Sequence, residues 1–268
     1  MSRSPAVRVL TGPVLATAVL LGVAGCGIAG GGRAASGSSR APVVSSAPPD
    51  AERPPVARAT PAMPPVLTEG QARAALVTRD DLGGPWVPTR GAATWRDALL
   101  KATTGDADCR RLLDVLYADD LFGAPGGPRA VVALDDVDTD AQLRHQVTAY
   151  RAAELDRTLH WMRTLPKRCG RFAASTAVGE RAEIRVTDEA LPEAGDARQG
   201  LRVTLTGTDT DGGAAVLTLE VAAVRVGEDA ISVTNGGLGE VVPDITRAVA
   251  ELGAQRLAEV RAQGRAQV

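Results

Sequence analysis

Few residues in this chain have the types and spacing that acid–base or metal chemistry needs. Its two histidines, His145 and His160, are fifteen residues apart, whereas a zinc site or a general base needs further ligands or an orienting partner close by. We therefore expect both histidines to lie at the surface or at its boundary. Trp86, Trp95 and Trp161 could line a pocket, but with so few aromatic residues in the chain we expect them to fill the core.

An acidic run from Asp136 to Asp140 imitates the start of a calcium-binding loop. A true EF-hand loop has Gly at its sixth position and Glu at its twelfth, where this chain has Ala141 and Val147. We interpret the run as the beginning of a helix, because the amino end of a helix attracts negative charge. No metal site is expected there.

The sequence has no motif for an activated nucleophile or a bound phosphate. It lacks a Gly-x-Ser-x-Gly elbow. Gly236, Gly237 and Gly239 lack the pattern and the basic partner of a nucleotide site, so we interpret them as a plain loop. The sequence thus predicts no catalytic residue, no metal and no cofactor, and no ligand-binding residue stands out.

The first residues have the layout of an export signal. Arg3 and Arg8 precede a hydrophobic run at 14–23, and small residues then lead to Cys26. Positions 23–26 resemble a bacterial lipobox, in which the cysteine thiol is acylated and the chain is cut just before it. We expect residues 1–25 to be a lipoprotein signal peptide and Cys26 to carry diacylglycerol, with acyl chains such as palmitate.

Two alternatives compete with the lipobox. A transmembrane helix needs roughly 20 apolar residues, and the uninterrupted run here is shorter. An ordinary secretory signal gains nothing from a cysteine at that position. Because two or more acyl chains anchor a protein stably, the predicted location is the cell membrane, lipid-anchored, on its extracytoplasmic face.

Cys109 and Cys169 are the two remaining cysteines. Disulfides persist outside the cytoplasm, so the simplest hypothesis is one bridge between them. In the chain-entropy model a bridge closing a loop of about 60 residues stabilises the fold by on the order of 4 kcal/mol. The alternative is a pair of buried free thiols.

Charge and composition exclude several classes of partner. From residue 67 onward the chain has 24 basic and 30 acidic residues, a net charge of −6. That balance argues against nucleic acid and against a polybasic contact with a membrane. Residues 26–66, rich in Gly, Ala, Ser and Pro, are expected to be a disordered tether behind the lipidated cysteine.

The helical periodicity begins after the tether. Thr68 and Gln71 have the capping-box pattern, which predicts a short helix. Asp106 is placed to cap a second helix, and we expect a third to begin at Thr139 or Asp140. Apolar stripes support these helices and a fourth: Ala72, Ala75 and Leu76; Cys109, Leu112, Leu113 and Leu116; Leu143, Val147 and Tyr150; and Leu155, Leu159, Met162, Leu165, Cys169 and Phe172.

In the second half of the chain, apolar and polar residues alternate as they do in β-strands. Strands are predicted at 129–134, 182–187, 200–206, 217–226 and 231–233, with Asp209 and Asp211 in a hairpin turn. A bulge near 222–223 would explain a change of phase in the fourth of these strands. A last helix is expected from Pro243. We predict a single α+β domain at 67–262, an antiparallel meander sheet with helices packed on one face, and a tail at 263–268.

Several segments resemble the PknH-like extracellular domain family. They are Leu-Thr-x-x-Gln-Ala-Arg-Ala-Ala-Leu from Leu67, the turn 81–86, Cys109 before Leu112-Leu113-Asp114, Val147-x-x-Tyr150, and Cys169. The family includes the sensor end of a mycobacterial Ser/Thr kinase and many actinobacterial lipoproteins. The resemblance implies a sensor or ligand-binding module with a cleft between sheet and helices. The kinase sensor carries two disulfides, whereas this chain can form one.

We expect a non-enzymatic, lipid-anchored module that binds an envelope ligand or protein partner. One alternative is an unrecognised envelope hydrolase that uses acids of the sheet; paired carboxylates in a deep cleft, one with a raised pKa, would favour it. The other is an envelope scaffold or assembly protein, which an exposed apolar patch would favour.

Overall fold

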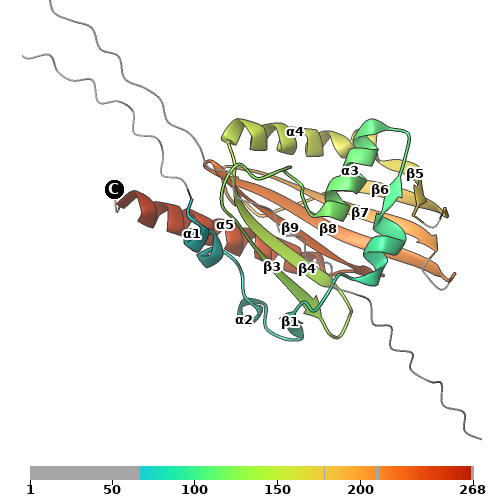
Figure 1. Cartoon of the computed structure of the whole chain (residues 1–268), viewed down its shortest axis with the longest axis horizontal. Coiled ribbons are helices and arrows are strands. Elements are labelled where there is room, and N and C mark those ends of the chain that lie inside the picture. Colours follow the sequence, from blue (N-terminus) through green and yellow to red (C-terminus); the bar gives the residue numbers. More distant parts are fainter. Residues whose placement is uncertain (1–66, 178, 209–211, 267–268) are drawn as a thin grey trace, which may run out of the picture. The chain divides into compact units, whose positions relative to one another are not determined.

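The computed structural model describes residues 67–177, 179–208 and 212–266 (Figure 1). The expected signal peptide, Cys26 and the tether lie outside these residues, as do positions 209–211 of the expected hairpin turn. Within the described part of the chain, no helix is both long and apolar enough to cross a bilayer.

The core of the fold is a nine-stranded antiparallel sheet in the order β1-β3-β4-β9-β8-β7-β6-β5-β2. Strands β5 to β9 form a meander, and the β3–β4 hairpin joins it through β9. The α+β class and the antiparallel meander are thus confirmed. The strands are β1 (Trp86–Pro88), β2 (Ala102–Thr103), β3 (Arg129–Asp136), β4 (Gln142–Ala149), β5 (Arg171–Thr176), β6 (Arg181–Glu189), β7 (Ala197–Thr208), β8 (Ala214–Val226) and β9 (Asp229–Leu238).

Helices cover both faces of this sheet, so the prediction of helices on one face was wrong. One apolar cluster contains Leu112 and Leu159 from the helices and Leu219 from β8. The other contains Val249 and Val224. Figure 1 accordingly shows α3 and α4 on one side of the sheet and α5 on the other. The helices are α1 (Glu69–Ala74), α2 (Arg79–Leu82), the π-helical η1 (Arg96–Leu100), α3 (Ala107–Ala118), α4 (Ala152–Arg168) and α5 (Pro243–Ala266).

The same two-sided burial explains the change of phase along β8. Leu219 and Val221 pack in one cluster, whereas Ala222 and Val224 pack in the other. The pairing with β7 runs through Ala222 without interruption, so the predicted bulge is absent. A strand buried on both faces simply loses its alternation of apolar and polar residues.

The segment after Asp140 is strand β4 and not the predicted third helix. Leu143 and Val147 are four residues apart, a spacing that puts them on one face of a helix and also on one face of a strand. Pairing with both β3 and β9 decides between the two. The predicted helices at Thr68, at Asp106 and through Leu155 are confirmed, although the stripe expected to reach Phe172 stops earlier, because Phe172 lies in β5.

A disulfide joins Cys109 of α3 to Cys169 at the end of α4. The two Cα atoms are 5.5 Å apart, and both residues are buried. Asp106 caps α3 by accepting hydrogen bonds from the backbone N–H groups of Asp108 and Cys109, at 2.9 and 3.0 Å. The helix start, the apolar stripe and the bridge therefore hold α3 against α4 on one face of the sheet.

Candidate functional site

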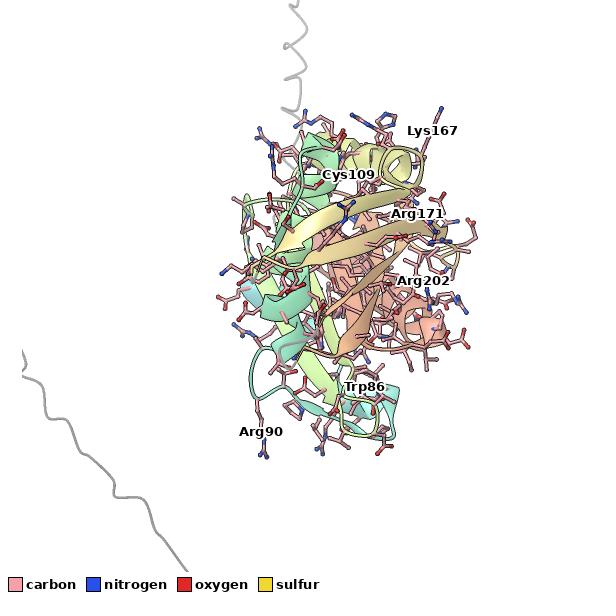
Figure 2. The ribbon with its side chains drawn as sticks, turned by 90° about the vertical axis from the view of Figure 1, so that its right-hand side faces the viewer. Trp86, Arg90, Cys109, Lys167, Arg171 and Arg202 are labelled. Atoms are coloured by element: carbon pink, nitrogen blue, oxygen red, sulfur yellow. A yellow bond between two sulfur atoms is a disulfide. The ribbon has the colours of Figure 1, made fainter. Side chains whose placement is uncertain are left out.

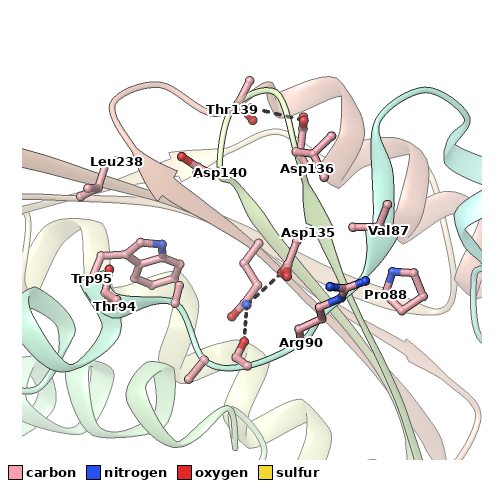
Figure 3. Close-up of a pocket in the computed structure, with 15 residues that line it drawn as sticks. Val87, Pro88, Arg90, Thr94, Trp95, Asp135, Asp136, Thr139, Asp140 and Leu238 are labelled. Atoms are coloured by element: carbon pink, nitrogen blue, oxygen red, sulfur yellow. Dashed lines mark hydrogen bonds between the residues drawn. The ribbon is translucent and has the colours of Figure 1, made fainter. Parts of the chain in front are cut away.

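A cavity lies where β1 and the β3–β4 turn meet the loop 89–95 (Figure 3). Its volume is about 930 Å³, within the range of pockets that hold small molecules. Acidic, basic and apolar side chains all contribute to the wall. The lining residues used below are Val87, Arg90, Gly91, Trp95, Asp135, Asp136, Val137, Thr139, Asp140, Gln142 and Leu238.

Two side chains tie the loop to the hairpin. Asp135 accepts a hydrogen bond from the Thr89 hydroxyl at 2.6 Å and another from Gln142 Nε2 at 3.0 Å. Gln142 Nε2 also donates to the carbonyl oxygen of Gly91 at 3.1 Å. The Asp135 carboxylate therefore holds the pocket wall together, and its position follows from the pairing of β1 with β3.

The acidic run forms the tip of the β3–β4 hairpin and not the start of a helix. Asp136 Oδ1 accepts hydrogen bonds from the backbone N–H groups of Asp138 and Thr139, at 2.9 and 3.3 Å. Asp140 adopts a left-handed conformation, with φ of 56°, which an aspartate tolerates better than most residues. Among the described residues, neither Asp140 nor Arg90 has a hydrogen bond or ion pair, so both charges are free to meet a ligand.

Trp95 forms the inner end of the pocket. It is buried, as predicted for a core residue, and it also lines the cavity. Its ring packs on Gly236, where an added Cβ would lie 3.2 Å from the indole Cη2 atom and would collide with Leu219. Gly236 and Gly237 both belong to strand β9, so the prediction that they lie in a plain loop was wrong.

The outer rim of the pocket is apolar. Val137 is 60% exposed and Leu238 is 47% exposed, and Val87 is also among the exposed large hydrophobic residues. Burial of such side chains by a ligand removes apolar area from water and favours binding. The pocket thus combines free charges with uncovered apolar surface.

The two histidines lie outside this site. His145 is fully buried, so its expected surface position was wrong, whereas His160 is exposed as predicted. The Nδ1 atom of His145 accepts a hydrogen bond from the backbone N–H of Val77 at 3.2 Å. Burial lowers the pKa of this imidazole to about 3, with a smaller contribution from Arg256. A neutral, enclosed imidazole of this kind links β4 to the segment after α1.

One cluster with metal-ligand residue types brings together Asp106, Cys109 and Cys169. Both sulfurs are engaged in the disulfide, so neither is a thiolate able to bind a metal. These residues hold two helices together and do not fit a metal centre.

Among the described residues, two carboxylic acids have a raised pKa, and neither lines the pocket. Burial raises the pKa of Glu220 to about 7, and burial also raises the pKa of Asp229. Each is paired with an arginine, Glu220 with Arg202 and Asp229 with Arg261. Their arrangement is that of separate buried ion pairs and not of two carboxylates facing one cleft.

The sequence did not single out the loop 89–95, Asp135 or Gln142 as site residues. The one local signal was the acidic run at 136–140, which was assigned to a helix. The site residues come together because β3 and β4 form a hairpin and β3 pairs with β1.

No protein-family model matches the chain, and no curated protein matches it. Among solved structures it is similar to the extracellular domain of PknH from Mycobacterium tuberculosis, with a TM-score of 0.48 and 12% identity, covering 75% of this chain and 100% of that chain. It is also similar to protein Ms6760 from Mycobacterium smegmatis, with a TM-score of 0.26 and 13% identity, covering 49% of this chain and 94% of that one.

Proposed function

We propose that this chain is a non-enzymatic ligand-binding module of the sensor type, held at the extracytoplasmic face of the cell membrane by the lipid on Cys26. The observation that supports a binding role is the cavity of about 930 Å³ with its mixed lining. Its wall is fixed by hydrogen bonds, and two of its charged side chains have no partner among the described residues. Preorganised walls of this kind reduce the entropy lost on binding.

The lining selects a ligand with a cationic group and an apolar part. The lining includes three carboxylates, those of Asp135, Asp136 and Asp140, and one guanidinium, that of Arg90. Asp135 and Asp136 already accept hydrogen bonds from the protein, so Asp140 is the acid left to pair with a ligand amine. Val137 and Leu238 provide the apolar contact.

The pocket lies far from the point at which the chain enters the domain. Helix α5 begins at Pro243, shortly after the pocket residue Leu238, and its last turns share a small cavity with Leu67. A helix of 24 residues is about 36 Å long. A domain tethered through Leu67 would therefore present the pocket at its free end, where an envelope ligand can reach it.

A series of alkylamines, alkyl alcohols and alkyl carboxylates of equal chain length tests the proposed selectivity. The readout is the shift in thermal unfolding midpoint, because a ligand that binds the folded state stabilises it. We expect the amines to raise the midpoint more than the alcohols and the carboxylates not to raise it. Asp140→Asn should remove the advantage of the amines, since it removes the free negative charge.

Val137→Ser and Val131→Ser form a matched pair for the apolar part. Both valines are exposed, but only Val137 lines the pocket. Weaker binding in Val137→Ser alone would support the assignment. Equal stabilisation by the amines, alcohols and carboxylates, or stabilisation by none of them, would contradict the proposed selectivity. Hydrolysis of ester, amide or glycosidic probes by the purified chain would favour the hydrolase alternative.

A protein partner is the second candidate occupant of this end of the sheet. Val216 and Val242 are 41% and 57% exposed. Both lie near Leu238 at the end of the sheet, because Val242 follows Leu238 by four residues and the Val216 carbonyl oxygen accepts a hydrogen bond from the N–H of Gly239. Together with the rim of the pocket they extend the apolar surface that a scaffold protein would use. Crosslinking on intact cells from a cysteine placed at Val242 would detect such a partner.

A further inference from the structure

Basic side chains form a stripe along the exposed side of α4. Arg157, His160, Arg163 and Lys167 are all exposed and lie on one side of the helix. Among the described residues, no acid pairs with Arg157, Arg163 or Lys167. Figure 2 shows Lys167 pointing out from the end of this helix, away from the sheet.

Helix α3 adds two more cations beside the stripe. Arg110 and Arg111 are exposed, and the guanidinium of Arg111 lies 3.9 Å from the centre of the Trp161 ring on α4. Arg111 and Arg157 line the same cavity of about 400 Å³. The acid in that cavity, Glu154, is already paired with Arg151 at 2.6 Å. Among the described residues, Arg111 and Arg157 therefore have no acid paired with them.

The helix dipole accounts for part of this stripe only. Cations are favourable in the last turn of a helix, which holds Lys167 and Arg168. Arg157 and Arg163 lie nearer the middle of α4, where the dipole contributes little. Arg168 is also paired with Asp108 of α3. Neither the helix dipole nor an ion pair among the described residues therefore accounts for the charges of Arg157 and Arg163.

We propose that the α3–α4 face, defined by Arg110, Arg111, Arg157, Arg163 and Lys167, binds the surface of an anionic phospholipid bilayer. The stripe from Arg157 to Lys167 is about 15 Å long at 1.5 Å per residue, and it runs along the outside of a helix, so it meets a broad surface better than a small ligand. Arginine binds phosphate oxygens through paired N–H donors. The net charge of −6 is a sum over all residues from 67 onward, so it does not show that basic side chains gather along α4.

Docking through this face leaves the pocket open. Figure 1 shows α4 and β1, the strand before the loop 89–95, on opposite sides of the domain, and Figure 2 shows Lys167 and Arg90 at opposite ends. A domain resting on the membrane through α4 would point its pocket away from the lipid. The bilayer proposal does not depend on the pocket having a ligand, so the two can fail separately.

The test is co-sedimentation with vesicles, using a shortened chain that begins at Ala59 and so lacks the signal segment. Both apolar clusters are built from residues within 67–257, so this chain is expected to fold alone. We expect binding to vesicles of phosphatidylcholine mixed with phosphatidylglycerol and none to phosphatidylcholine alone. Binding should weaken as salt is raised, because exposed charges are screened.

Charge reversal at two sites separates this face from nonspecific attraction. Arg157→Glu with Arg163→Glu should lower the partition coefficient by about 25-fold or more, at about fivefold per lost cation. Arg181→Glu with Arg185→Glu changes the same number of exposed arginines, on β6, which also have no ion pair within the described part of the chain, and it should have little effect. Circular dichroism and the unfolding midpoint verify that both double variants fold. Lys167→Glu is an additional variant that changes a single cation of the α3–α4 face.

Each outcome decides the proposal. Loss of binding confined to the α4 variants supports it. Equal loss in the β6 variant, binding to neutral vesicles, or no binding to any vesicle overturns it. Release from the vesicles by millimolar inorganic phosphate, with the effect of salt matched, would also overturn it, because that result would indicate a site for a small anion instead.

Discussion

The Glu220 carboxylate is fully buried, and Nη1 of Arg202 lies 2.6 Å from its Oε1 atom. Its other oxygen, Oε2, has no hydrogen-bond donor among the described residues, and neither has Oδ1 of Asn235, the residue directly opposite on β9. A proton on Glu220 would supply the donor that these two acceptors lack. Burial and the nearby Glu189 together raise the pKa of Glu220 to about 7.

This relationship predicts a stability that falls as the pH rises. The pKa of Glu220 in the folded state, about 7, lies above its ordinary value of 4.5, so the folded state binds the proton more tightly than the unfolded state. The stabilisation is complete below pH 4.5 and is lost as the pH rises through 7. Its size is about 3–4 kcal/mol, at about 1.4 kcal/mol per pKa unit.

Glu220→Gln tests this prediction. The amide keeps a neutral side chain of the same shape, so the free energy of unfolding should lose its decline between about pH 5 and pH 8, compared by urea denaturation. An unchanged decline in the variant would assign it to other groups. Asp229 also has a raised pKa, and Asp229→Asn is therefore measured beside it.

Gly253→Ala should destabilise the fold. An added Cβ at this position of α5 would lie 2.7 Å from His145 Nε2 and 3.2 Å from the Ile231 Cδ1 atom, both of them in the interior. We expect a loss of about 1–3 kcal/mol in unfolding free energy, the range for overpacking a core. The measurement is chemical denaturation of both proteins.

Gly264→Ala, on the same helix, is its control. The added methyl would meet the end of the Gln71 side chain, which can move aside, and alanine favours a helix by up to about 1 kcal/mol over glycine. Equal destabilisation at both positions would show that the loss at Gly253 does not come from contact with His145.

The Cys109–Cys169 disulfide should stabilise the domain by about 2–4 kcal/mol. Replacing both cysteines with alanine removes the bridge without leaving a free thiol, and the denaturation midpoint of this variant should match that of the reduced native protein. Intact mass under nonreducing conditions should be two hydrogens lower than the reduced mass. A native midpoint that does not respond to reductant would contradict the prediction.

Cys26→Ala should abolish acylation and the processing that depends on it. The protein would then shift in mass and lose the stable membrane association that two or more acyl chains provide. Fractionation of cells that carry the native or the altered chain measures this. Equal processing and equal membrane association in the two strains would show that Cys26 is not the anchor.

Local features of the fold were predictable because the interactions that form them are local. Thr68 with Gln71 caps α1, and Asp106 caps α3, within three residues of chain. The stripe from Leu155 to Leu165 marked α4, because a run of that length fits a helix and exceeds most strands. The inward position of Cys109 followed from the same periodicity.

Only the tertiary structure decided the features that depend on pairing between distant segments. Leu143 and Val147 share a face in a helix and in a strand alike, so hydrogen bonds to β3 and β9 had to choose between them. That choice made the acidic run a hairpin tip and brought Asp135 to the loop 89–95, which created the pocket.

Charge shows the same division. The sequence determined the net charge of the domain, whereas the fold placed the charges. Among the described residues, Arg157 and Arg163 on α4 and Asp140 in the pocket have no ion-pair partner. The net charge does not say where each charge lies, whereas electrostatic attraction depends on the distances between charges.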